Sequence, residues 1–325
     1  SELAPREDEI EGVKIKRFPA TKVGGESYMV WNFEKDLLAL RPEIIIAHSY
    51  RHPHTTMASK IAKKINAKCF LVTHAPFSAG NHSLVARIYI KYFHDPLVGR
   101  KTLSRFDKII AITKWEYPYL KNLGVKKEKI EYIPNGIPEE FFSYSRLSKE
   151  ENKILFFGRV APIKSLETLI KAVKFIRNKE VQIEIAGPGE EKYLEKLKSF
   201  IREEKVENRF VFSGPIYELK AKKKNIDSAK LFILPSKSEA MPQSLIEAMA
   251  RGKIAIGSDN NGNKDLINNN NGLLFKIRDE KDLADKINQA LEQKSDLMKK
   301  NAKKSVKQFS WEIVIKKLDK LIQSV

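Results

Sequence analysis

Short apolar runs alternate with amphipathic helical stretches along most of this 325-residue chain. The runs are apolar at successive positions, which is typical of parallel strands covered by helices on both faces. This alternation predicts βαβ units and parallel sheets, and therefore an α/β fold. The predicted strands are residues 43–47, 68–73, 108–112, 129–133, 153–157, 181–186, 209–212, 230–234 and 254–256.

The chain is long enough for two domains of this kind. A turn at 134–138 and a polar stretch at 143–152 without a core pattern indicate the boundary. We predict two doubly wound, Rossmann-like domains, residues 1–142 and 150–309, that face a central crevice. Residues 310–325 are expected to form a helix that packs back on the first domain. The first domain is expected to be N-terminally incomplete, because no apolar strand precedes the Gly24-Gly25 turn and nothing before Val13 supplies the strand, Gly-rich turn and helix that normally open such a domain.

The chain is basic, with a formal net charge of +19 at pH 7. Residues 84–129 contribute 11 Lys or Arg and four Asp or Glu, an excess of +7. No nucleic-acid partner is expected, because no recognition motif accompanies the charge. The single cysteine, Cys69, excludes a disulfide framework and a Cys-based metal cluster. The opening residues are polar and acidic, unlike a signal peptide, and no apolar run approaches the ~20 residues of a membrane span. The cytoplasm is therefore expected.

Ligands of open α/β sheets bind beyond the carboxyl ends of the strands. In "FFGRVAPIK" a predicted strand ends at Gly158, and Arg159 and Lys164 flank a turn before a helix. Ser165 can serve as the N-cap of that helix, 165–176. Two cations beside a helix N-terminus can bind a phosphate. The alternative is a pair of surface cations in a basic chain.

The stretch "SEAMPQSLIEAMARG" places Glu239 in a loop after a predicted strand and Glu247 within a predicted helix, 243–250. Pro242 stands at the start of this helix, so we expect the amides of Gln243, Ser244 and Leu245 to point into the crevice. Carboxylates bind sugar hydroxyls rather than phosphate. A ligand that carries both sugars and phosphates would use the whole stretch. The alternatives are an ordinary helix acid at Glu247, or a glycosidase pair, which requires two acids facing each other across a bond.

All six histidines lie within residues 48–94, without a metal-binding spacing, so no metal site is expected. His74 differs from the others because it ends a predicted strand and enters the loop "THAPFSAGNH" at the edge of the crevice. This position favours a hydrogen-bonding role toward a ligand over a purely structural one.

Taken together, these motifs resemble the GT-B glycosyltransferases of the large retaining group that includes bacterial and archaeal mannosyl- and glucosyltransferases (family 4). The similar segments are "FFGRVAPIKSLETLIKAV", "IEIAGPGEE", the Glu-x7-Glu stretch "LPSKSEAMPQSLIEAMARGKIAIGSD", "IPNGI" and "FSWEIVIKKLDKLI". They occur in the family's order and cover nearly the whole chain. The resemblance implies a GT-B fold and transfer of a hexose from a nucleotide-diphosphate sugar, a GDP- or UDP-sugar, with retention and without a metal or cofactor.

The resemblance also implies roles for individual residues. Arg159 and Lys164 would bind the diphosphate, Glu247 the ribose and Glu239 the transferred sugar. His74 would reach that sugar from the first domain and share the catalytic role with Glu239. The donor-binding residues implied are Gly158, Arg159, Lys164, Gly187, Ile216, Met241, Gln243, Ser244, Leu245 and Glu247.

Three positions depart from the family pattern. Met241-Pro242 stands where the family has Phe-Gly or a similar pair, Ser165 where a Gly commonly follows the Lys, and Asn261-Gly262 where it has a Gly-Gly turn. The family's opening strand and Gly-rich loop are also not found. Two alternatives to transfer therefore stay open: a non-catalytic or impaired nucleotide-sugar-binding protein, and a sugar-nucleotide epimerase.

The segment 84–105, "LVARIYIKYFHDPLVGRKTLSR", mixes cations with apolar and aromatic residues. A basic amphipathic helix suits an anionic membrane surface. Arg87, Lys91, Arg100 and Lys101 are therefore the candidate residues for a membrane or acceptor contact, with a glycan or a lipid-linked glycan as the acceptor. This would place the protein peripherally on the inner face of the membrane. The alternative is a core-packed helix with a solvated basic face.

Overall fold

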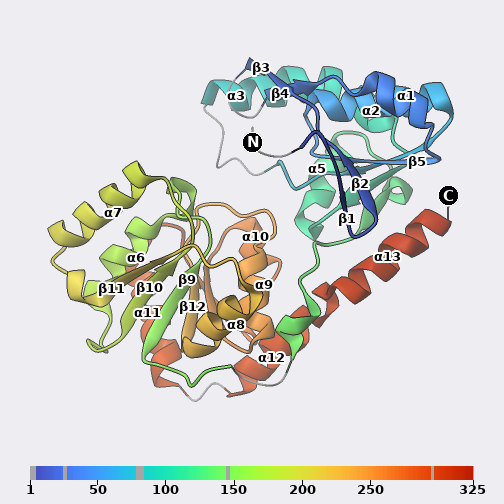
Figure 1. Ribbon diagram of the computed structural model, residues 1–325. Helices are drawn as coiled ribbons and strands as arrows, with labels where there is room; N and C mark the ends of the chain where they lie inside the picture. Colours follow the sequence, from blue (N-terminus) through green and yellow to red (C-terminus); the bar gives the residue numbers. More distant parts are fainter. Residues whose placement is uncertain (1–4, 25–27, 78–83, 144–146, 294–295, 325) are drawn as a thin grey trace.

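The computed structural model describes residues 5–24, 28–77, 84–143, 147–293 and 296–324. Gly25 of the predicted turn and His82 of the loop after His74 lie outside these ranges. The described chain forms two α/β domains, each built on a parallel sheet (Figure 1). The GT-B-like arrangement predicted from the sequence is thus present.

The first domain is built on a parallel sheet in the order β5-β6-β7-β8. Two antiparallel hairpins precede it, β1 with β2 and β3 with β4. The strands are β1 (Glu7–Ile10), β2 (Val13–Lys16), β3 (Ala20–Gly24), β4 (Tyr28–Trp31), β5 (Ile44–His48), β6 (Lys68–Val72), β7 (Lys108–Ala111) and β8 (Ile130–Tyr132). The helices are α1 (Glu34–Leu40), α2 (Pro53–Ile65), α3 (Leu84–Tyr89), α4 (Arg100–Ser104) and α5 (Tyr117–Asn122), with a π-helical stretch, Ile90–Gly99, between α3 and α4.

The second domain is built on a six-stranded parallel sheet in the order β11-β10-β9-β12-β13-β14. Its strands are β9 (Lys153–Phe157), β10 (Gln182–Ala186), β11 (Phe210–Gly214), β12 (Leu231–Leu234), β13 (Ile254–Ser258) and β14 (Gly272–Phe275). Its helices are α6 (Leu166–Ala172), α7 (Glu191–Glu203), α8 (Leu219–Ser228), α9 (Gln243–Ala250), α10 (Asn261–Lys264), α11 (Glu280–Glu292) and α12 (Asp296–Val306). The order runs outward from β9 in one direction and from β12 in the other, so the topology reverses between these two neighbours.

Helix α9 forms as its sequence predicts. Pro242 directly precedes its first residue, and Gly252, with φ +72°, follows its end in the left-handed conformation typical of a helix C-terminus. Helix α6 differs from the expectation. Ser165 does not cap it through its side chain, because its backbone is itself left-handed, with φ +52°. This conformation favours glycine, the residue that the related sequences commonly carry here.

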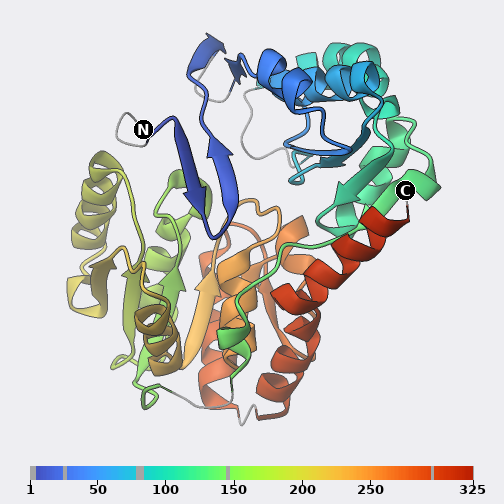
Figure 2. The same cartoon turned by 45° about the vertical axis from the view of Figure 1, so that its right-hand side comes forward.

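Two chain segments cross between the domains side by side. The amide of Ile137 donates to the carbonyl of Phe309 (2.8 Å), and the amide of Trp311 donates back to Ile137 (3.2 Å). Helix α13 (Trp311–Gln323) then runs to the first domain (Figures 1 and 2). There the ammonium of Lys317 lies 5.4 Å from the ring centroid of Tyr132. The crossing segments therefore behave as one paired connection.

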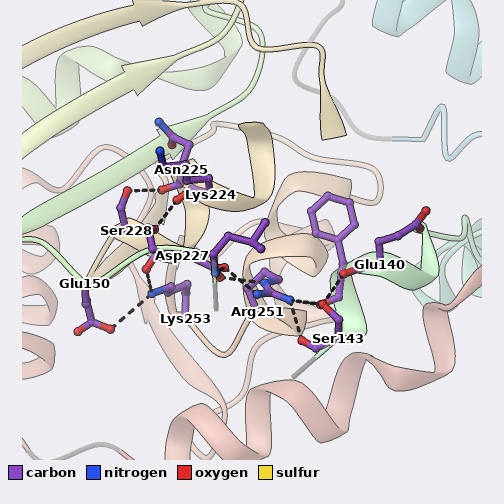
Figure 3. Close-up of polar contacts among 12 residues, drawn as sticks. Glu140, Ser143, Glu150, Lys224, Asn225, Asp227, Ser228, Arg251 and Lys253 are labelled. Atoms are coloured by element: carbon purple, nitrogen blue, oxygen red, sulfur yellow. Dashed lines mark hydrogen bonds and ion pairs between the residues drawn. The ribbon is translucent and has the colours of Figure 1, made fainter. Parts of the chain in front are cut away.

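A buried ionic network anchors the first crossing segment to the second domain (Figure 3). Arg251 donates to both carboxylate oxygens of Asp227, at 2.8 and 2.7 Å, with side chains that are 2% and 0% exposed. Arg251 also donates to the carbonyl and hydroxyl oxygens of Ser143, at 2.7 and 2.9 Å. Lys253 donates to the carbonyls of Asp227 and Ala229, at 2.7 and 2.6 Å. This network therefore holds the chain at Ser143 against the second domain.

We expect Asp227→Ala to lower the free energy of unfolding by about 3–5 kcal/mol, because it removes the carboxylate that neutralises the buried Arg251 guanidinium. Denaturant unfolding measures the change. Glu292→Ala, which breaks the exposed Arg177–Glu292 pair, should cost about 1 kcal/mol or less. Equal losses in the two variants would contradict the anchoring role.

Candidate functional site at the domain crevice

The reversal of strand order between β9 and β12 defines where a ligand should bind. At such a switch point the loops after the two neighbouring strands leave in opposite directions and open a crevice. The loop after β9 contains Gly158, Arg159 and Lys164, and the loop after β12 contains Glu239. Sequence motifs 75 residues apart are thereby brought to one place.

Lys164 and Glu239 meet at this point as an ion pair. Nζ of Lys164 lies 2.6 Å from Oε1 of Glu239, and the side chains are 18% and 10% exposed. The hydroxyl of Ser236 donates to the same oxygen at 2.5 Å. The residues predicted to bind the diphosphate and the transferred sugar are therefore in direct contact.

The loop that carries Glu239 rests on the backbone of the second domain. Gly262 packs against it so closely that a Cβ there would lie 2.6 Å from the carbonyl oxygen of Glu239 and 2.7 Å from that of Ala240. Asn260 donates its side-chain amide to the carbonyl of Ser236 (3.0 Å), and Ser258 donates its hydroxyl to the same oxygen. Gly262, the one glycine at the position of the family's Gly-Gly turn, thus allows the Glu239 loop to pack closely against α10.

Three glycines at neighbouring strand ends form the other side of the crevice. The amide of Gly158 donates to Ala186 (2.9 Å), and the amide of Gly187 donates to Gly214 (2.7 Å). A Cβ on Gly187 would lie 2.0 Å from the carbonyl oxygen of Gly158. Only glycine fits at position 187, so the ends of β9 and β10 can lie this close together.

Arg159 lies exposed beside these glycines, in the lining of a 220 Å³ cavity that also includes Pro188 and Tyr193. Within the described ranges it has no hydrogen bond or ion pair. It therefore differs from Lys164, whose charge is already neutralised by Glu239.

Glu247 is a buried acid, not a surface helix acid. It is 5% exposed, and Lys222 of α8 lies 2.7 and 2.6 Å from its two carboxylate oxygens. The Lys222 ammonium also lies 4.9 Å from the ring centroid of Phe157. Burial raises the pKa of Glu247, and the charge of Lys222 opposes this shift. Glu239 and Glu247 thus belong to separate ion pairs, which does not favour the glycosidase alternative.

The start of α9 offers fewer free amides than expected. The amide of Leu245 donates to the carbonyl of Pro242 (3.2 Å), so the prediction that it points freely into the crevice is wrong. Pro242 directly precedes the helix and its carbonyl closes the first turn. The amides of Gln243 and Ser244 have no backbone acceptor in the described part of the chain. Met241 is buried, and its sulfur accepts from the amide of Asn135 (3.3 Å).

Ile216, which was predicted to lie near the nucleotide base, is half-buried in the loop after β11 and packs against the core of the second domain. It is followed by Tyr217, a ring that is almost fully exposed. The structure thus leaves an uncovered aromatic face at this end of the crevice.

The first domain brings two histidines together at the opposite wall. Nδ1 of His48, at the end of β5, lies 2.9 Å from Nε2 of His74, directly after β6. His74 and Ala75 have φ of +59° and +51°. Such backbone strain persists only where the surroundings fix it. The buried carboxylate of Glu116 does so, because it accepts from the hydroxyl of Thr73 and from the amide of Ala75 (3.1 Å).

The predicted basic helix is present, and most of its described apolar side chains are exposed, although Leu103 packs in the core. Seven of them are 46–77% exposed: Val85, Ile88, Tyr89, Tyr92, Phe93, Leu97 and Val98. Arg87, Lys91 and Arg100 line a 660 Å³ pocket with the rings of Phe77 and Tyr119, while exposed Lys101 lies outside its lining. The alternative of a core-packed helix is therefore wrong. None of the helices in the described ranges combines the length and apolar character that crossing a bilayer requires.

Among the described residues, no group of three or more His, Cys, Asp or Glu side chains is arranged to hold a metal ion. The crevice instead offers paired cations and backbone amides. Two Rossmann-like α/β domains arranged in this way define the GT-B fold.

Comparison with known families agrees with this fold. The family described as "Glycosyl transferases group 1" matches residues 138–308, more than half of the chain, and "Glycosyltransferase Family 4" matches residues 2–141. The chain belongs to this glycosyltransferase family, as the sequence motifs predicted.

Individual relatives are distant. An uncharacterized glycosyltransferase of Methanocaldococcus jannaschii is 26% identical over 96% of this chain and 84% of its own length. An N,N'-diacetylbacillosaminyl-diphospho-undecaprenol alpha-1,3-N-acetylgalactosaminyltransferase of Campylobacter jejuni is 23% identical over 74% of this chain and 62% of its own.

Solved structures share the fold. Anabaena HepE in complex with UDP and glucose has a TM-score of 0.75 at 19% identity, covering 90% of this chain and 81% of HepE. Sucrose-phosphate synthase of Thermosynechococcus elongatus has a TM-score of 0.76 at 20% identity, covering 99% of this chain and 86% of its own.

Sequence reasoning did not identify Lys222 and Glu116 as residues of the crevice. They are contributed by separate βα units, so no local motif links them to Glu247 or His74. His48 and Ser236 do follow from the sequence, because both lie directly at the end of predicted strands, and His48 ends the strand next to the one that ends at His74.

We expect His48 and His74 to titrate below pH 6.5, because burial lowers the pKa of both imidazoles. A nearby histidine lowers each pKa further, His54 in the case of His48 and His48 in the case of His74. The unfolded chain takes up these protons near pH 6.5. The resulting stabilisation is therefore present above pH 6.5 and is lost as the pH falls through the folded-state pKa values. NMR titration of the ring signals, assigned with His48→Ala and His74→Ala, measures this. Midpoints at or above 6.5 would contradict it.

Proposed function

We propose that this chain is a retaining, metal-independent hexosyltransferase that uses a nucleotide-diphosphate sugar as donor. The Lys164–Glu239 ion pair at the β9/β12 switch point is the observation that carries the proposal. It holds a cation suited to a phosphate and an acceptor suited to sugar hydroxyls 2.6 Å apart. A ligand that carries a phosphate next to a sugar would engage both partners at once.

The leaving diphosphate would be stabilised without a metal ion. Arg159 and Lys164 supply two positive charges, and the amides of Gln243 and Ser244 supply the positive end of α9. Donors of this kind, fixed where negative charge develops, lower the barrier without reorganising. Gly158 and Gly187 leave the room for the diphosphate to approach the backbone.

The rest of the donor would extend from this point in two directions. The transferred hexose would accept and donate hydrogen bonds at Glu239, with His74 approaching from the first domain. The ribose would lie toward Glu247, and the base toward the backbone of Ile216. Met241 and Leu245 would shape the pocket from the start of α9.

The acceptor would bind on the first domain, and we propose a glycan or lipid-linked glycan presented at an anionic membrane surface. Exposed apolar rings on α3 and the π-helical stretch can insert at the lipid interface while Arg87, Lys91, Arg100 and Lys101 meet its charge. The name of the Campylobacter relative includes a diphospho-undecaprenol acceptor. A shared arrangement would place this protein peripherally on the cytoplasmic side of the membrane.

Glu239→Ala is expected to abolish transfer while leaving part of the donor binding, because the nucleotide contacts survive. Glu247→Ala should mainly weaken the nucleotide, by roughly 1–3 kcal/mol for lost charged hydrogen bonds. Radiolabelled sugar transfer and calorimetric titration with GDP- and UDP-sugars measure the two effects. Normal transfer by both variants would show that the site is wrong. Donor binding without transfer or donor hydrolysis by the native chain would favour the non-catalytic alternative, and interconversion of sugar nucleotides would favour the epimerase.

Replacing Arg87, Lys91, Arg100 and Lys101 together by Gln should weaken binding to anionic vesicles by about 1 kcal/mol for each cation near the surface. Cosedimentation with phosphatidylglycerol vesicles measures this. The matched control replaces four exposed lysines of the second domain, Lys192, Lys220, Lys224 and Lys300. Equal losses of vesicle affinity in the two variants would show that only the net charge matters, and would contradict a membrane-binding face on the first domain.

A further inference from the structure

A short turn after β7, residues 113–116, touches both catalytic loops. On one side it reaches the second domain. The carboxylate of Asp265, directly after α10, accepts from the amides of Lys114 (2.9 Å) and Trp115 (3.4 Å). The indole N–H of Trp115 donates to the carbonyl of Ala240 (3.3 Å). Ala240 follows Glu239 directly.

On its other side the same turn grips the His74 loop. Glu116 is fully buried and accepts four hydrogen bonds. Two come from Thr113 within the turn, at 3.0 and 3.1 Å, and two from Thr73 and Ala75. The donors outside the turn are the two neighbours of His74. A movement of the turn therefore carries His74 with it.

We propose that the 113–116 turn couples closure of the two domains to the relative position of His74 and Glu239. Trp115 is the positioning residue that holds the His74 loop at a fixed distance from the Glu239 loop. The inference rests on the proposed function, since it assigns these loops to the same reaction. The path is continuous: Glu239, the carbonyl of Ala240, the Trp115 indole, Glu116, and the backbone on both sides of His74.

Transfer would need a contact that fixes the two domains relative to each other, because the reacting groups come from both. The donor is held mainly by the second domain, while His74 belongs to the first. The two domains are joined by paired crossing segments. A displacement of about 1 Å at reacting groups can lower a rate by about 10²-fold. A contact at the catalytic loop fixes their relative position more closely than contacts at the distant connection.

Trp115→Phe removes the indole N–H and retains an aromatic ring against Tyr119, whose centroid lies 5.9 Å away. We expect kcat to fall at least tenfold while the dissociation constant for a GDP- or UDP-sugar changes less than threefold. Lys114→Gln is the matched control, because Asp265 binds the backbone amides of the turn, and it should leave both values unchanged. A fall in donor affinity that accounts for the whole loss of activity would overturn the positioning role.

The coupling to His74 is tested by a double-mutant cycle. If Trp115 acts through His74, Trp115→Phe should lower kcat much less in a His74→Ala background than in the native one. Equal fold-losses in both backgrounds would overturn the proposal.

A third measurement does not depend on transfer and so separates this inference from the proposed function. Spin labels at Lys121→Cys and Lys196→Cys report the distance between the domains. Burial raises the pKa of the native Cys69 to about 12, so it stays unlabelled. With UDP or GDP present, Trp115→Phe and Asp265→Ala should both broaden the distance distribution toward larger values. A distribution identical to that of the native chain would overturn the proposal even if the chain transferred no sugar.

Discussion

The ion pair between Lys164 and Glu239 is the contact on which the architecture of this site depends. It exists because β9 and β12 are neighbours whose connections leave in opposite directions, so that the loops after them meet. The rest of the crevice supports this contact. Gly262, Asn260 and Ser258 hold the Glu239 loop from behind. The two charges neutralise each other in a position where either one alone would be a largely buried, unpaired charge.

A second buried ion pair, between Arg251 and Asp227, lies away from the crevice and has a structural role. The Arg251–Asp227 pair is more deeply buried and bonds the chain at Ser143 instead of facing a ligand. It holds the crossing segment at Ser143 on the second domain, so its role is structural, whereas the Lys164–Glu239 pair is proposed to bind the donor.

Local signals carried most of what the sequence could predict. The nine predicted strands correspond to β5–β13, because each is an apolar run bounded by turn residues. The four-residue β14 was missed, since Gly272–Phe275 follows an Asn run that signals a turn. The motifs located Lys164, Glu239 and His74, but not their contacts. Lys222 with Glu247 and Asp265 with Trp115 pair across separate elements, which no local spacing encodes. Ser165 was misread as a cap because a favourable residue type does not reveal a left-handed backbone.

We propose that donor binding breaks the Lys164–Glu239 ion pair, so that Lys164 binds the diphosphate and Glu239 binds the sugar of the same molecule. Calorimetry that compares a nucleoside diphosphate with the matching nucleotide-diphosphate sugar tests this directly. In the native chain the nucleotide-diphosphate sugar should bind more tightly than the nucleoside diphosphate. In Glu239→Ala this difference should vanish. The variant should still bind the nucleoside diphosphate at least as well as the native chain, because Lys164 is then free to contact the phosphate. An undiminished contribution of the sugar in Glu239→Ala would contradict the account.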